Sequence, residues 1–240
     1  MFTQRGDDAS RVIWRLKIMN SPVSSSLLSP GKGLAFAIML VLAVVVSAMS
    51  ARFFLPDPPM AQAMQNHLED RPVVFLVHVG GGIVALMLGA LQFVTRLGRR
   101  RKWHATAGRI YVVACLVGAA SGLVIAQFSF AGPVATAGFS GLAVVWFVTT
   151  AMGLREILAG RIVAHRRWMV RSYAVTLAAV TLRLMLPMPP LMGLDFVEGY
   201  RAISFMCWIP NLILAEIWIA RSARRATPGE PKRGLRSVSA

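Results

Sequence analysis

Six long runs of apolar residues alternate along the chain with short polar or charged connections. The runs cover residues 33–55, 72–95, 106–130, 133–154, 168–190 and 201–220. Each run approaches or exceeds the ~20 helical residues needed to cross the hydrocarbon core of a bilayer. The pattern therefore predicts an all-α, polytopic membrane protein with six transmembrane helices.

Lysine and arginine residues gather at alternate connections. They stand before the first run, between the second and third, between the fourth and fifth, and after the sixth, whereas the other connections are acidic or uncharged. Basic residues near the ends of spans stay on the cytoplasmic side of a membrane. We therefore expect both termini to be cytoplasmic, with a basic N-terminal segment at 1–32 and a disordered basic tail at 221–240.

The composition agrees with lipid as the solvent of this chain. Of its 240 residues, 56% are hydrophobic, and the mean hydropathy is +0.60 despite a formal net charge of +16. Because membrane orientation accounts for the basic residues, nucleic acid is not an expected partner. The expected partners are the bilayer and its anionic lipid headgroups. Cys115 and Cys207 both fall inside spans and indicate neither a disulfide nor a CxxC metal site.

Polar residues inside the spans return to single helix faces. At 3.6 residues per turn, one face of the fifth run carries His165, Met169, Ser172, Thr176 and Arg183. One face of the second run carries His78, Gly82, Ala85, Gly89, Gln92 and Arg96, and one face of the third carries His104, Gly108, Tyr111, Cys115, Gly118 and Gly122. A polar stripe is costly against lipid and small residues allow close helix packing, so these faces are predicted to line the bundle interior.

The predicted topology places these polar residues in two clusters. His104 and His165 lie at the cytoplasmic starts of their helices, near Gln92 and Tyr111. Arg183 lies about 27 Å from His165 along the fifth span, at a depth similar to that of His78.

The inner cluster suggests a redox cofactor. Two histidines at matching depth on facing helices are what a b-type haem needs for its two axial ligands, and the same pair is suited to a divalent metal. In this interpretation His104 and His165 bind the metal, while Tyr111 and Arg183 contribute to the cofactor site. The alternative is that both histidines, which stand in basic segments, only contact lipid headgroups.

The outer cluster suggests a different class of function. Arginine recognises carboxylates and phosphates, and an ionisable group inside a span often belongs to a proton or substrate path. A small-solute or proton-coupled transporter would use His78 and Arg183, with Gln92 and Thr176 along the path. In the structural alternative, Arg183 extends to the interface and His78 makes an interhelical hydrogen bond. A third class is a membrane-embedded assembly protein without catalysis.

Four segments carry a resemblance to a known family: "FLVHVGGGIVALMLGALQF" (75–93), "HATAGRIY" (104–111), "GFSGLAVVWFVTT" (138–150) and "HRRWMVRSYAVTLAAVTLR" (165–183). The chain resembles the bacterial predicted membrane proteins of the domain of unknown function 2306 (DUF2306) family. The resemblance covers about residues 70–190. It implies a four-helix core of spans two to five, with spans one and six outside it, in a bacterial inner (cytoplasmic) membrane. It names no reaction.

The outline is also similar to transmembrane b-type cytochromes with two haems. There the third and fifth spans supply one ligand pair, which corresponds to His104 and His165. The second pair would need a histidine in the fourth span to face His78, and residues 133–154 contain none. The first functional hypothesis is therefore electron transfer through one b-type haem, with transport and assembly as the alternatives.

Overall fold

The computed structural model describes residues 30–56, 62–94 and 101–226, and within these ranges it is helical without strands. The predicted all-α class is confirmed. The elements are α2 (Pro30–Ala51), the 3-10 turn η2 (Arg52–Phe54), α3 (Gln62–Asp70), α4 (Pro72–Val94), α5 (Arg101–Ala126), α6 (Pro133–Leu158), α7 (Ile162–Thr176), α8 (Ala178–Met185), α9 (Met188–Leu191), α10 (Phe196–Met206) and α11 (Ile209–Ala226).

Six segments of the described chain are long and apolar enough to cross a membrane, which confirms the polytopic prediction. They are Gly33–Phe54, Pro72–Gln92, Lys102–Ala126, Pro133–Leu158, Ile162–Leu191 and Phe196–Arg224. The fifth and sixth begin earlier than the predicted 168 and 201. Long basic side chains explain the difference for the fifth, because they extend to the interface and let a helix start before its apolar run does.

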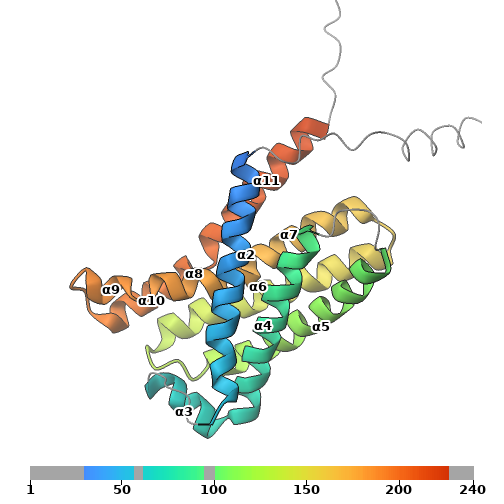
Figure 1. The fold of residues 1–240 in the computed structure, drawn as a ribbon. Coiled ribbons are helices and arrows are strands. Elements are labelled where there is room, and N and C mark those ends of the chain that lie inside the picture. Colours follow the sequence, from blue (N-terminus) through green and yellow to red (C-terminus); the bar gives the residue numbers. More distant parts are fainter. Residues whose placement is uncertain (1–29, 57–61, 95–100, 227–240) are drawn as a thin grey trace, which may run out of the picture. The chain divides into compact units, whose positions relative to one another are not determined.

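Helices α4 to α7 form an antiparallel bundle. Each packs on the next, α7 also contacts α4, α10 packs on α6, and α11 packs on α7 (Figure 1). The chain forms two units, Met1–Met39 and Leu40–Ala240, and every contact described below lies within the second. We call "the basic end" the end of the bundle where α6 finishes and α7 begins, and "the Arg183 end" the opposite one.

Helices α4 and α5 approach each other most closely at glycines. A Cβ atom added at Gly81 would lie 2.9 Å from the carbonyl oxygen of Ala114 and 3.1 Å from Cα of Gly118. On its other side Gly118 faces the Trp146 indole, which would lie 3.0 Å from a Cβ at that position. The predicted role of small residues in the bundle interior therefore holds for Gly118. On α4 the contact is made by Gly81 and not by the predicted Gly82, whose added Cβ would meet nothing within 4 Å.

The fifth and sixth spans are both interrupted. In the fifth, α7 ends at Thr176, whose hydroxyl donates to the Ser172 carbonyl at 2.9 Å. Such bonds to the preceding turn bend helices. In the sixth, α10 ends at Met206 and α11 starts at Ile209. Pro210 lacks the amide hydrogen that would continue the helical ladder to Met206.

Candidate functional site

A network of buried hydroxyl groups occupies the centre of the bundle. The Tyr111 hydroxyl lies 2.9 Å from Ser172 Oγ and 3.2 Å from Thr176 Oγ1. Thr150 Oγ1 lies 2.7 Å from Ser172 Oγ, and Trp146 Nε1 donates to Thr176 Oγ1 at 2.9 Å. All five side chains are buried. The network joins α5, α6 and α7, and it places the predicted polar faces of α5 and α7 against each other.

This network satisfies its own polar groups. Thr150 and Thr176 also donate to carbonyls of their own helices, at 2.8 and 2.9 Å. Tyr111 is 1% exposed. A buried polar network with its hydrogen bonds made specifies the packing of a core. Tyr111 therefore contributes to the bundle interior, and its hydroxyl is engaged within the protein.

The basic end brings His104 and His165 near each other. His104 is exposed at the start of α5 and lies close enough to His165 for their charges to interact. His165 Nδ1 lies 2.7 Å from the Gly153 carbonyl oxygen. A carbonyl only accepts, so Nδ1 carries the hydrogen that joins His165 to Gly153. Gln92 donates to the His104 carbonyl at 3.0 Å, and its own Oε1 is buried without a partner among the described residues.

The described side chains at the basic end do not form a closed metal site. No group of three His, Cys, Asp or Glu side chains is placed to hold a metal ion within the described ranges. Glu216 of α11 is already paired with Arg171, whose Nη2 donates to Glu216 Oε2 at 2.8 Å.

Arg183 does not belong to the same site as His165. It lies in α8, about 27 Å away along the span. Its Nη1 donates to the Ala179 carbonyl at 2.9 Å, and its Nη2 donates to Ser50 Oγ of α2 at 2.7 Å. The four predicted cofactor residues are thus divided between two ends of the bundle and the hydroxyl network between them.

Arg183 instead lies at the centre of a group of cationic side chains. Two other basic side chains, Arg52 in η2 and His78 in α4, lie within electrostatic range of its guanidinium. His78 Nδ1 lies 2.8 Å from the Gly118 carbonyl oxygen, so Nδ1 donates and Nε2 is left to accept or bind a proton. We call Arg52, His78 and Arg183 "the cationic cluster".

No carboxylate pairs with either arginine of the cationic cluster among the described residues. Arg52 Nε is buried without a hydrogen-bond partner there, and so is Ser47 Oγ of α2. The acids at the start of α10 have other partners: Asp195 accepts from the Glu198 amide at 2.9 Å, and Glu198 pairs with Arg201. Like charges within a membrane are costly without a counterion, and an anion would offset this cost.

Sequence reasoning included His78 and Arg183 but missed Arg52, Ser47 and Ser50. Arg52 stands at the end of an apolar run, where an arginine usually marks only the interface. The available signal was the spacing of Ser47 and Ser50, which places two hydroxyls on one face of an otherwise apolar helix.

One comparison with known proteins gives a match. The family model described as "Predicted membrane protein (DUF2306)" matches residues 75–219. The match begins in α4 and ends in α11, so the expectation that the sixth span lies outside the family unit was wrong. The packing of α10 on α6 and of α11 on α7 explains why that span belongs with the core. Searches of curated proteins and of solved structures gave no match.

Proposed function

The chain belongs to the DUF2306 family of predicted membrane proteins, and we propose that it binds a small anionic solute at the Arg183 end and carries it across the membrane. The observation that supports this most is the cationic cluster. Arg52, His78 and Arg183 come together from three helical elements, and among the described residues no acid neutralises the two arginines.

The geometry of the cluster favours an oxyanion. Guanidinium groups match the oxygens of carboxylate, phosphate and sulfate. The buried Nε of Arg52 and the Ser47 hydroxyl are donors without partners in the described chain. His78 Nε2 adds a third group that can donate once it is protonated. A bound anion would satisfy these donors and offset the repulsion between Arg52 and Arg183.

The bundle centre supports coupling to protons. Thr176 lies about 10 Å along the span from Arg183, and from there hydroxyl groups continue to Ser172 and Thr150. Gln92 and His165 stand at the other end. Within this proposal, His78 accepts a proton when the anion binds, and the hydroxyl groups lie along the route between the two ends.

The proposed orientation places both termini in the cytoplasm of a bacterial cell, with the protein in the inner membrane. Arg155, Arg161, Arg166 and Arg167 gather at the basic end, whereas Glu69, Asp70, Asp195 and Glu198 precede spans at the Arg183 end. Basic residues stay inside, so the cationic cluster faces the external leaflet and receives its anion from outside.

Binding is tested by the melting temperature of the purified protein in detergent, with sodium phosphate, sulfate and succinate titrated at constant ionic strength. At least one of these anions is expected to raise the melting temperature of the wild type saturably, because a ligand of the folded state stabilises it. Arg183→Gln should abolish the response without lowering the melting temperature of the ligand-free protein, since the charge removed is uncompensated. Arg71→Gln, at the same end but paired with Asp70, should keep the response.

Transport is tested with proteoliposomes on a solid-supported membrane. A concentration jump of the stabilising anion is expected to give a transient current in the wild type and in Arg71→Gln, and none in Arg183→Gln. An anion response that survives in Arg183→Gln would overturn the binding site. Binding without any current in the wild type would overturn transport.

A second candidate function, haem-mediated electron transfer, is supported by one observation at the basic end. The Nδ1 of His165 donates to the Gly153 carbonyl, an arrangement that orients Nε2 as a metal ligand. His104 would supply the second axial nitrogen.

The haem hypothesis is tested by visible spectra of protein purified from haem-supplemented cells, oxidised and then reduced with dithionite. A Soret band and a sharp reduced alpha band are expected, both absent from His104→Ala and His165→Ala. His67→Ala is the control, because His67 lies in α3 and packs on Phe75. A colourless wild type would exclude the cofactor.

A further inference from the structure

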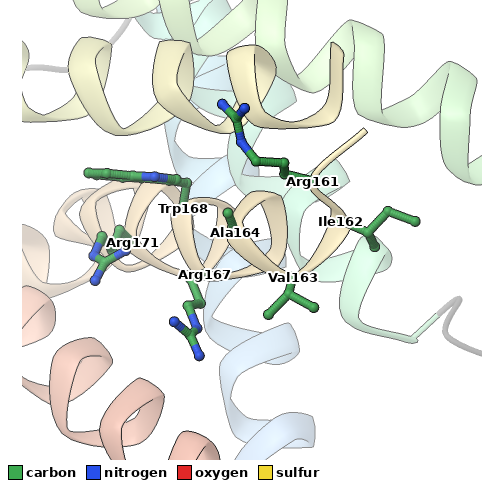
Figure 2. Close-up of a pocket in the computed structure, with 7 residues that line it drawn as sticks. All are labelled: Arg161, Ile162, Val163, Ala164, Arg167, Trp168 and Arg171. Atoms are coloured by element: carbon green, nitrogen blue, oxygen red, sulfur yellow. The ribbon is translucent and has the colours of Figure 1, made fainter. Parts of the chain in front are cut away.

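A hollow of about 510 Å³ lies at the start of α7, on the surface of the basic end. Its lining residues are Arg161, Ile162, Val163, Ala164, Arg167, Trp168 and Arg171. Figure 2 shows Ala164 in the middle, with Arg161 and Trp168 on one side of α7 and Val163 and Arg167 on the other. The hollow is separate from the cationic cluster and from both histidines of the basic end.

The charges around the hollow leave one cation without a partner. Arg161 Nη2 donates to Glu156 Oε1 at 2.9 Å, and this carboxylate raises the pKa of Arg161. Arg171 is bound to Glu216. Arg167 has no hydrogen-bond or ion-pair partner among the described residues. The lining therefore keeps one net positive charge, which suits a ligand with a single negative charge.

The start of α7 adds a second feature that favours an anion. Its N-cap residue, Arg161, makes no side-chain hydrogen bond to the helix, and the helix has 15 residues. The first amides of a helix have no partner within it, and the helix dipole favours negative charge there. The Ile162 amide already donates to the Gly160 carbonyl at 3.1 Å, so a phosphate oxygen in the hollow would accept from the Val163 and Ala164 amides.

The remaining lining is apolar and lies open. Ile162 and Val163 are 54% and 65% exposed. The Arg171 guanidinium lies 4.6 Å from the centre of the Trp168 ring, which holds the indole at the rim. Tryptophan beside basic residues and exposed aliphatic side chains is the pattern of a surface at the membrane interface.

We propose that this hollow binds the phosphodiester of an anionic phospholipid such as phosphatidylglycerol. Arg167 and the Val163 and Ala164 amides contact the phosphate, Trp168 covers the glycerol, and the acyl chains extend past Trp168 into the bilayer, while Ile162 and Val163 border the headgroup. A free phosphate ion would use the cation and the amides but would leave the apolar side chains uncovered. The proposal is independent of the anion site at the Arg183 end.

The test is native mass spectrometry of the full-length protein in mixed micelles that hold equal amounts of phosphatidylglycerol and phosphatidylcholine. The wild type is expected to retain phosphatidylglycerol about fivefold over phosphatidylcholine, the size of effect that one basic residue gives at an anionic surface. Arg167→Gln should lose this preference, and Arg167→Lys should keep most of it. Arg166→Gln is the matched control, because Arg166 is the neighbouring exposed arginine and does not line the hollow.

Several results would overturn the proposal. Equal retention of the two lipids by the wild type would show that the hollow does not select an anionic lipid. Equal losses of the lipid preference in Arg166→Gln and Arg167→Gln would indicate that diffuse surface charge, and not the hollow, causes it. Displacement of the lipid by millimolar inorganic phosphate would identify a free-phosphate site. Unchanged melting temperatures of the variants confirm that they are folded.

Discussion

Gly81→Ala is expected to lower the free energy of unfolding by about 1–3 kcal/mol, the cost of inserting a methyl group into a closely packed contact. The added Cβ would lie 2.9 Å from the Ala114 carbonyl oxygen and 3.1 Å from Gly118 Cα. Both are backbone atoms of α5, so no side chain can rotate away. The two helices must separate, and the His78 bond to the Gly118 carbonyl lies at the same crossing.

Gly82→Ala is the matched control for this prediction. No described atom beyond the local chain lies within 4 Å of a Cβ at Gly82. Both substitutions exchange the same residue types in α4, so the gain in helix propensity is common to them. Gly82→Ala should be neutral or stabilising. Equal effects of the two substitutions would contradict the close approach of α4 and α5.

The free energy of unfolding of both variants is measured in SDS-containing mixed micelles, with a thiol-reactive fluorescent dye as the probe of unfolding. Cys115 and Cys207 are the only cysteines of the chain and both are fully buried. The dye therefore reacts only when the bundle opens, and Cys115 reports on α5 while Cys207 reports on the junction of α10 and α11.

Thr176→Val is expected to destabilise the protein by about 1–2 kcal/mol, because the buried Trp146 Nε1–H loses its acceptor. In a Trp146→Phe variant the indole N–H donor is absent, so Thr176→Val should lower the free energy of unfolding less there than in the wild type. A double-mutant cycle should give a coupling energy of about 0.6 kcal/mol or more, as for interhelical hydrogen bonds in membranes.

The control for the hydroxyl network is Thr149→Val. Thr149 is buried in the same helix as Trp146, but its hydroxyl bonds only to the Val145 and Trp146 carbonyls of α6. Thr149→Val should lower the free energy of unfolding less than Thr176→Val does. Its effect should also be additive with that of Tyr111→Phe. Additive effects of Thr176→Val and Trp146→Phe would argue against the bond between them.

The part of this architecture that depends on local pattern could be predicted from the sequence. The period of 3.6 residues placed Ser172 and Thr176 on one face of the fifth span and Tyr111 on one face of the third, and the structure brings these faces together. Each prediction needed only the residues of one helix and the cost of polar groups in lipid.

Relations between distant helices could not be predicted in this way. In lipid no strong hydrophobic force orders the helices, and neighbours are chosen by detailed packing. Arg52 and Ser50 therefore gave no sign that they would meet Arg183. The same limit applies to Arg183 and His165, which share a face of one span yet serve opposite ends of the bundle.

The contact between Ser50 and Arg183 has a consequence for biosynthesis, because the two residues are 133 positions apart in the chain. At roughly 5–20 residues per second of synthesis, α8 follows α2 by about seven to twenty-seven seconds. During that interval the first span holds Ser50 in the membrane before Arg183 has been made. The contact between α2 and α8 thus closes only after α4 to α7 have been made, and the newly made first span depends on the insertion machinery or on water at the interface until then.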